Sequence, residues 1–239
     1  MTRTLPFIEL DAPSARTAVL ALEGASSRDL VLALALARRY DDAPLSIAVD
    51  GGLAAFVALR RRPAVIAGDF DSVRSSVHGL KRIRFPREKD FSDFAGALAE
   101  AIPRRVRLVV VAGLLGGRID HEWANLFEAG RAAKRLAAVV AIDRRALVVV
   151  TARDVTLRVP RRRLVSVFAL NGPAQVSLRG TRWKLSRKRL LPGSLGLSNL
   201  AAARTVALTV HSGVAALVVP SRNAKTSRAT RARSSRTVP

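Results

Sequence analysis

The feature that most constrains the fold of this chain is a change of pattern near residue 143. From Thr17 to Asp143, short apolar runs alternate with longer stretches whose apolar residues recur at helical spacing, a pattern typical of strands and crossover helices in a parallel sheet. The expected strands are 17–22, 45–49, 64–67, 81–85, 106–111 and 137–142, and the expected helices are 27–39, 52–61, 91–101 and 120–135.

Beyond Asp143 the chain consists of strand-sized segments separated by turn residues such as Asn171-Gly172-Pro173. These segments are 146–151, 154–159, 164–170, 174–179, 204–210 and 214–219. No long helix fits, so this half is predicted to be an antiparallel β-sandwich or barrel. The predicted organisation is an N-terminal arm (1–16), an α/β Rossmann-like three-layer domain (17–144), a smaller all-β domain (145–220) and a basic disordered tail (221–239).

Composition excludes several classes of function. The chain has no cysteine, so disulfides, thiolate nucleophiles and cysteine-ligated zinc are absent. Glu9 and Asp11 lie where a secretory signal needs an apolar core, and no apolar run approaches the roughly 18 residues of a membrane span. We therefore expect a cytoplasmic protein without a membrane partner.

The net charge of +23 could indicate a nucleic-acid partner. However, 35 of the 41 basic residues are arginine, they are scattered along the whole chain, and a coding bias toward Arg and Ala explains them equally well. Aromatic residues make up only 5%, too few for a base-stacking surface. Nucleic acid is thus unlikely to be the main partner, although a nucleic-acid-binding protein remains the rival from another functional class.

Of only 18 acidic residues, six are aspartates in or just after the loops that follow the predicted strands. They are Asp50, Asp69, Asp71, Asp90, Asp93 and Asp120. In a parallel sheet these loops open at one edge, so the carboxylates should converge there. Helix N-capping is the commoner fate of any single aspartate, but a cluster of carboxylates is costly unless a cation neutralises it. Asp69 and Asp71, two residues apart in an extended loop, can both face a Mg²⁺ ion.

Glycines stand in the same loops, at Gly51, Gly52, Gly68 and within 113–117. Glycine lets backbone amides approach phosphate oxygens closely, but neither a Walker A loop nor a dinucleotide fingerprint is present. With Arg118 and Lys89 beside them, the glycines form a plausible polyphosphate cradle, since both cations bind phosphate.

Six sequence blocks, in order, resemble those of the thiamine pyrophosphokinase family. They are Val49–Gly52, Gly68–Ser72, Glu88–Asp93, Gly116–Asn125, Gly180–Leu185 and Gly196–Asn199. The resemblance covers about residues 18 to 220. It implies transfer of a pyrophosphoryl group from ATP to the hydroxyethyl oxygen of thiamine, giving thiamine diphosphate and AMP. It also implies a homodimer whose active site lies between subunits.

The acidic loops and the resemblance together lead to expected roles for several residues of the blocks. Mg²⁺ is expected on Asp69, Asp71 and Asp93. Catalytic roles are expected for Asp71, Asp93, Arg118 and Asp120, and nucleotide contacts for Asp50, Gly51, Gly52, Lys89, Asp90, Gly117, Arg118 and Asn125. Thiamine contacts are expected from Trp183, Ser198 and Asn199. Whether Asp71 or Asp93 accepts the alcohol proton is left open, and His121 is expected to orient its loop.

Two departures from the family pattern leave the acceptor open. Phe91-Ser92 stands where the family commonly has a variable residue and then threonine, and 196–199 carries fewer hydroxyls than some relatives. A related pyrophosphokinase family that acts on a hydroxymethyl pterin has a similar acidic loop. An indole such as Trp183 suits a cationic thiazolium or a flat pyrimidine, although a half-buried sheet residue is an equally good interpretation of it.

Overall fold

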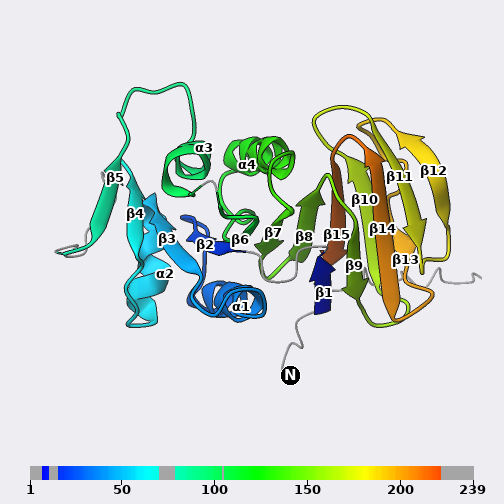
Figure 1. Cartoon of the computed structure of the whole chain (residues 1–239), viewed down its shortest axis with the longest axis horizontal. Helices are drawn as coiled ribbons and strands as arrows, with labels where there is room; N and C mark the ends of the chain where they lie inside the picture. Colours follow the sequence, from blue (N-terminus) through cyan, green and yellow to red (C-terminus); the bar gives the residue numbers. More distant parts are fainter. Residues whose placement is uncertain (1–6, 11–15, 70–78, 104, 222–239) are drawn as a thin grey trace, which may run out of the picture.

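The computed structural model describes residues 7–10, 16–69, 79–103 and 105–221. Its strands form two sheets (Figure 1): a ten-stranded mixed sheet in the order β13-β10-β15-β8-β7-β6-β2-β3-β4-β5, and a five-stranded antiparallel sheet in the order β1-β9-β14-β11-β12.

The first half of the chain supplies the parallel part of the main sheet. Its strands are β2 (Thr17–Ala21), β3 (Leu45–Val49), β4 (Val65–Gly68), β5 (Lys81–Arg84), β6 (Leu108–Ala112) and β7 (Ala138–Ile142). Its helices are α1 (Ser27–Ala37), α2 (Leu53–Ala58), α3 (Asp93–Gly96) with a π-helical turn (Ala97–Ala101), and α4 (Ile119–Ala133). The expected strands and helices of this half are confirmed within a few residues.

The helices cover both faces of this sheet, because its strands alternate apolar side chains between two cores. Val19 and Ala21 of β2 belong to the core that contains α1 and α2, whereas Leu20 belongs to the core beneath α3 and α4. Figure 1 shows the two helix pairs on opposite sides of the sheet. Helix α1 begins with a capping box, in which Ser26 Oγ accepts from the Asp29 amide and the Asp29 carboxylate accepts from the Ser26 amide.

The order of the parallel strands creates a crevice beside β2. The chain proceeds outward through β3, β4 and β5, and β6 then returns to pair with the other side of β2. The strand order therefore reverses between β2 and β6, and the loops at their carboxyl ends lead in opposite directions along the sheet. Open α/β sheets bind ligands at such a point.

The second half of the chain extends the main sheet and also builds the second one. Strands β8 (Ala146–Thr151), β10 (Leu164–Ala169), β13 (Asn199–Leu200) and β15 (Ala215–Pro220) continue the main sheet. The second sheet contains β1 (Phe7–Leu10), β9 (Val155–Arg158), β11 (Ala174–Arg179), β12 (Leu185–Leu190) and β14 (Thr205–Ser212). Leu157 and Leu178 of the second sheet share a core with Val167 and Leu217 of the main sheet, so the two sheets pack as a sandwich.

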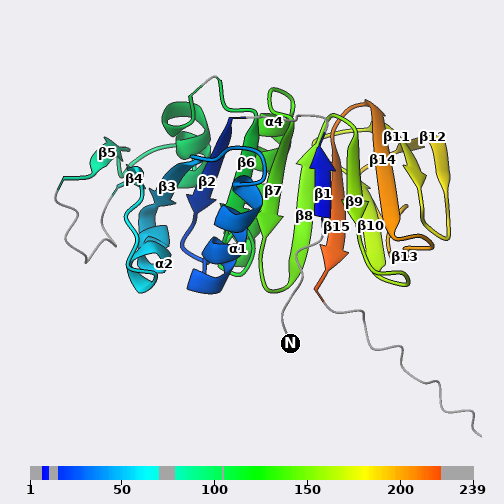
Figure 2. The same cartoon turned by 60° about the horizontal axis from the view of Figure 1, so that its bottom comes forward.

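The parallel pairing expected of the first-half strands is confirmed, but the sheet that they form is mixed. β8 pairs antiparallel with β7 through Ile142 and Leu147, so the main sheet runs from β5 to β13 across the expected boundary at residue 144 (Figure 2). Strand β12 was also missed, because four of its residues, 186–189, are exposed and give no apolar alternation. The expected disordered tail lies outside the described residues from 222 onward. Among the helices of the described residues, none is long and apolar enough to cross a membrane.

Candidate active site

A pocket opens at the carboxyl edge of the parallel strands, beside β2. Loops after β2, β3 and β6 line it together with the beginnings of α3 and α4. The lining residues are Leu22, Glu23, Gly24, Val49, Asp50, Ser92, Asp93, Phe94, Gly113, Leu114, Gly117, Arg118, His121, Glu122 and Asn125. The pocket thus brings together Asp50, Asp93, Gly117, Arg118 and Asn125 of the predicted site.

Asp50 sits directly after β3 in a left-handed conformation, with φ of 44°. Its Oδ1 atom is buried and has no hydrogen-bond partner among the described residues. Burial raises the pKa of Asp50 to about 7, and the Asp93 and Asp69 carboxylates act in the same direction while Lys89 opposes them. Gly68 makes room for this carboxyl group, because a Cβ on Gly68 would lie 1.8 Å from Asp50 Oδ1.

Asp93 is the first residue of α3, whose N-cap Ser92 accepts a hydrogen bond from the Ala95 amide. Lys89, four residues earlier in the chain, forms an ion pair with Asp93. Its Nζ atom lies 3.0 Å from Asp93 Oδ1 and 3.1 Å from the carbonyl oxygen of Pro86. The lysine side chain is only 8% exposed. A largely buried cation is therefore fixed beside the Asp93 carboxylate and also lowers the pKa of Asp50.

The donor set suits a hard cation. Carboxylate oxygens are the ligands that Mg²⁺ prefers, and the unsatisfied Asp50 Oδ1 beside Asp93 is the kind of buried atom that a cation would satisfy. Among the described residues, however, no group of three or more possible ligands is close enough to hold a metal ion. Asp71, which the sequence predicts as a ligand and possible base, lies outside the described residues.

Arg118 and Asp120 form an exposed pair at the rim of the pocket. The Arg118 guanidinium donates to both Asp120 carboxylate oxygens, the shorter contact being 2.6 Å. The hydrogen bonds from Arg118 lower the pKa of Asp120. Arg118 lines the pocket but Asp120 does not. An exposed ion pair of this kind contributes little to stability and can exchange its partner for a phosphate at low cost.

The other predicted residues of the α/β part have mixed positions. Gly51 and Gly52 belong to a 3₁₀ turn after β3 and do not line the pocket; a Cβ on Gly52 would lie 1.9 Å from the Ala21 carbonyl oxygen. Asp90 is exposed and lines a neighbouring hollow instead. Asn125 is buried and its amide donates to the Leu114 carbonyl oxygen at 3.5 Å, while His121 is an exposed residue of the pocket lining.

The three predicted thiamine contacts lie on the second half of the chain, away from this pocket lining. Asn199 is buried, and its side-chain amide accepts from the Trp183 amide at 3.1 Å and donates to the Trp183 carbonyl at 2.6 Å. The Trp183 ring is 54% exposed, with the Arg182 guanidinium 4.9 Å from its centroid. Ser198 is exposed, and its amide donates to Ser166 Oγ. Asn199 thus holds the Trp183 backbone and presents the indole outward.

Sequence reasoning missed Glu122 and Glu23, which also line the pocket. Glu122 lies inside the fourth sequence block, so its place near the other site residues could have been inferred from the sequence. Its partner Arg145 is 23 residues away in the turn between β7 and β8. No spacing pattern in the sequence connects the two.

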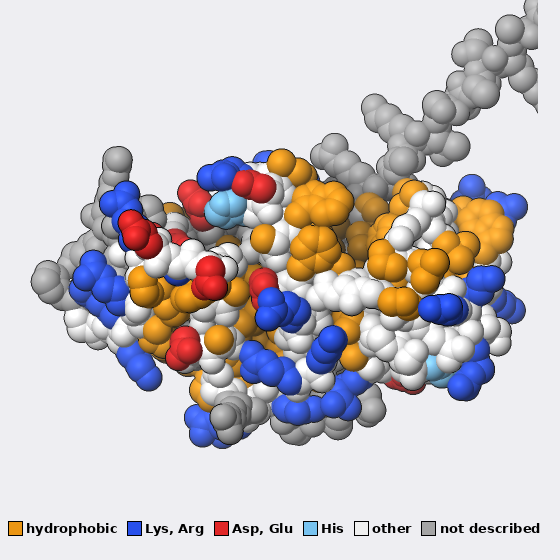
Figure 3. All heavy atoms as spheres, turned by 90° about the horizontal axis from the view of Figure 1, so that it is seen from above, with side chains coloured by type: hydrophobic (Ala, Val, Ile, Leu, Met, Phe, Trp, Pro, Cys, Tyr) orange, Lys and Arg blue, Asp and Glu red, His pale blue; other side chains and the backbone are white. Residues whose placement is uncertain are grey.

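An apolar groove of about 660 Å³ adjoins the pocket on the far side of α4. It is lined by residues of β8, β10 and β15, and Trp123 and Phe127 of α4 form one wall. Those two side chains are 60% and 46% exposed. Figure 3, which looks down on this side, shows exposed hydrophobic side chains gathered there.

The fold is α/β, and the pocket at its switch point combines clustered carboxylates, an exposed arginine and glycine-containing loops. Groups of these types can bind phosphates and a divalent cation. Residues 36–141 match the family described as "Thiamin pyrophosphokinase, catalytic domain". The match confirms the resemblance seen in the four sequence blocks that lie within this segment.

Individual proteins show further similarities to the chain. Over 82 residues the chain is 37% identical to thiamine pyrophosphokinase 3 of Oryza sativa subsp. japonica, a match that spans 29% of this chain and only 31% of the rice protein. The crystal structure of thiamine pyrophosphokinase from Bacillus subtilis superposes with a TM-score of 0.72 and 20% identity, covering 87% of this chain and all of that one. Thiamin pyrophosphokinase from Candida albicans gives 0.64 at 15% identity, covering 86% of this chain and 89% of that one. The chain therefore has the fold of these enzymes.

Proposed function

We propose that this protein is a thiamine pyrophosphokinase, transferring pyrophosphate from ATP to thiamine to give thiamine diphosphate and AMP. The observation that carries the proposal is the meeting of Asp50 and Asp93 in one pocket, with Lys89 paired to Asp93, within the segment that matches the catalytic-domain family.

The side chains present can bind and neutralise a polyphosphate. Lys89 is held close to Asp93 and supplies a nearly buried positive charge, and Arg118 can exchange Asp120 for phosphate oxygens. Mg²⁺, when bound by Asp93 with Asp69 and Asp71, would neutralise charge on the transferred phosphates. Catalysis then rests mainly on positioning and electrostatics, as is usual for phosphoryl transfer. Asp93 remains a candidate base for the alcohol proton of the acceptor.

We further propose that the active site is completed by a second copy of the chain. Trp183 presents an exposed ring on a part of the molecule that does not line the pocket, so the acceptor and the nucleotide sites are separate within one chain. The apolar groove beside α4 supports an interface, because exposed apolar surface of this kind is costly in a monomer. In a homodimer, Trp183, Ser198 and Asn199 of one subunit would complete the pocket of the other.

Other finer predictions from the sequence are retained as part of this proposal. They are the Rossmann-like character of residues 17–144, the substrate-binding and dimerising function of 145–220, and a cytoplasmic location.

AMP release from ATP and Mg²⁺ tests the function directly, with thiamine, with a hydroxymethyl pterin and with no acceptor. We expect AMP only with thiamine, and Asp71→Asn should abolish most of it without loss of folding. Release with the pterin alone would instead assign the alternative acceptor. Salt-sensitive nucleic-acid binding without any AMP would support the inactive, nucleic-acid-binding alternative.

A further inference from the structure

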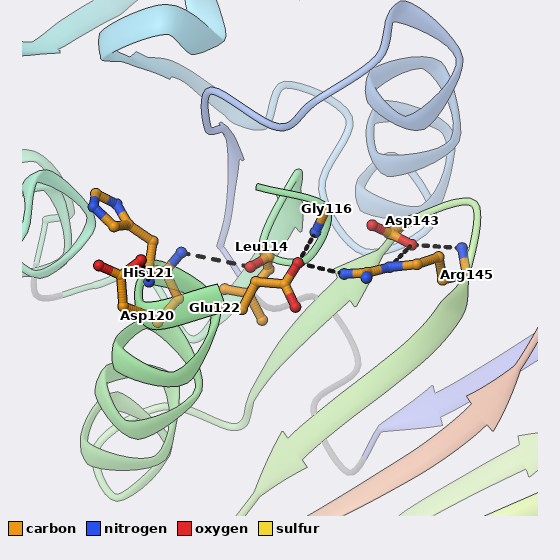
Figure 4. Close-up of polar contacts among 8 residues, drawn as sticks. Leu114, Gly116, Asp120, His121, Glu122, Asp143 and Arg145 are labelled. Carbon is orange, nitrogen blue, oxygen red and sulfur yellow. Dashed lines mark hydrogen bonds and ion pairs between the residues drawn. The ribbon is translucent and has the colours of Figure 1, made fainter. Parts of the chain in front are cut away.

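Glu122 connects the glycine loop after β6 to a distant turn. It lies in the first turn of α4 and is 9% exposed, and its Oε1 atom accepts hydrogen bonds from the Gly116 amide and from the Arg145 guanidinium, the latter at 2.6 Å. Figure 4 shows the glutamate pointing away from its own helix, toward both donors. Arg145, in the turn between β7 and β8, is anchored in its turn by Asp143, whose Oδ1 accepts from the Arg145 amide.

The loop that Glu122 contacts needs such support. Gly116 has φ of 106°, a conformation favoured only by glycine, and a Cβ on the next residue, Gly117, would meet nothing within 4 Å. A glycine loop with open space beside it has many accessible conformations, and fixing it has an entropic cost. Gly113 and Gly117 line the pocket, so the conformation of this loop decides where its amides point.

An ordinary helix-capping role does not account for these contacts. An acidic residue in the first turn of a helix is stabilising by itself, because it faces the positive end of the helix dipole. The hydrogen bonds of the Glu122 carboxylate, however, come from Gly116, which precedes the helix, and from Arg145, which belongs to a different turn. Burial raises the pKa of Glu122, but these donors outweigh it, so the net effect is a lowered pKa and a charged carboxylate.

We propose that Glu122, Arg145 and Asp143 form a positioning clamp that holds the 113–117 loop in the conformation that binds the phosphates of the nucleotide. Glu122 and Arg145 are positioning residues: they fix the loop and Arg145 neutralises the glutamate, which would otherwise repel the phosphates. The inference rests on the proposed function only in taking the pocket as a nucleotide site.

The test compares Glu122→Gln, Arg145→Met, Arg145→Lys and the double variant Glu122→Gln/Arg145→Met with the wild-type protein. Glu128→Gln is the matched control, since Glu128 is on the same helix and forms a surface ion pair with Arg131 at 3.3 Å. We expect kcat/KM for ATP to fall about tenfold in each of the first two variants, which is typical of losing one charged hydrogen bond. The KM for thiamine should stay nearly constant, and so should the thermal midpoint of Glu122→Gln, because Arg145 is half exposed and keeps Asp143 nearby. Arg145→Met leaves the Glu122 carboxylate without its charged partner and should lower the midpoint.

Two patterns distinguish a clamp from independent contacts. Because the residues act as one unit, the double variant should be no worse than the poorer single variant, and Arg145→Lys should recover part of the loss. The clamp would be contradicted if the losses of kcat/KM in the single variants added up in the double variant. It would also be contradicted if kcat/KM fell equally for ATP and thiamine in step with thermal stability. Glu128→Gln should stay within about twofold of the wild type, as for exposed ion pairs in general.

Hydrogen exchange separates this inference from the proposed function. Without any ligand, the amides of 113–117 should exchange faster in Glu122→Gln than in the wild type or in Glu128→Gln. Unchanged exchange in that segment would overturn the clamp even if the wild-type enzyme makes thiamine diphosphate. Faster exchange in Glu122→Gln, together with a wild-type protein that releases no AMP, would leave the clamp standing and remove only the proposed reaction.

Discussion

The pocket at the α/β edge and the surface around Trp183 differ in how their polar groups are satisfied. In the pocket, Asp50 Oδ1 is buried without a hydrogen-bond partner among the described residues, and Lys89 stands beside Asp93 with little access to water. Around Trp183, Asn199 satisfies the backbone of the indole residue and leaves the ring exposed. The pocket therefore has groups that can bind a charged ligand, whereas the Trp183 surface has an exposed aromatic ring that can bind a ligand or a second subunit. Under the proposed function, the nucleotide and the acceptor would be bound by different parts of the fold.

The largest expected effect tests the charged region. Asp93→Asn removes the carboxylate that pairs with Lys89 and that we propose as a metal ligand. Turnover, measured as AMP release, should fall by about 1000-fold, the scale seen when an electrostatic group is removed from a reaction centre. The circular dichroism spectrum should be unchanged. A variant with near-normal turnover would mean that the carboxylate pair is structural.

A smaller effect is expected when the proposed dimer is dissociated, which would separate the pocket of one subunit from Trp183 of the other. Trp123→Glu places a charge in the apolar groove, where burial of an unpaired charge opposes association. Sedimentation velocity should show a dimer for the wild type and a monomer for the variant, with activity reduced roughly in proportion. A variant that remains dimeric would locate the interface elsewhere, and a fully active monomer would contradict a shared site.

The acceptor side is tested by Trp183→Ala. Loss of the indole should raise the KM for thiamine about tenfold, since stacking against a cationic ring contributes about 1–2 kcal/mol. The KM for ATP should not change, because Trp183 does not line the pocket. A shift in the ATP constant instead would show that the two regions are not divided as we infer.

The smallest effect concerns the pH dependence of stability without Mg²⁺. Because the folded-state pKa of Asp50 is raised from 3.8 to about 7, the folded protein keeps this proton after the unfolded chain has lost it. The free energy of unfolding should therefore decrease as pH rises through that window. Asp50→Asn, which tolerates the left-handed backbone, should remove this dependence. Urea unfolding from pH 4 to 8 measures the free energy of unfolding of the wild type and of the variant. The same dependence on pH in the two proteins would contradict the raised pKa of Asp50.

The sequence predicted most elements of the first half because each strand there is a buried apolar run and each helix has apolar residues at helical spacing. It missed β12, whose edge position is compatible with the exposed run Ser186 to Arg189. It also missed that β8 continues the main sheet, because the pairing of β7 with β8 joins two segments that had been assigned to different domains.

The local pattern alone determined that acidic and glycine-containing loops follow the parallel strands, because strand periodicity and turn chemistry are properties of neighbouring residues. Only the tertiary structure decided which of these residues meet: Asp50 and Asp93 face one pocket, Asp120 turns outward to Arg118, and Glu122 reaches Arg145. The physical reason is that these contacts depend on strand order and on the direction of each side chain at the end of its element, and both are fixed by packing between segments far apart in the chain.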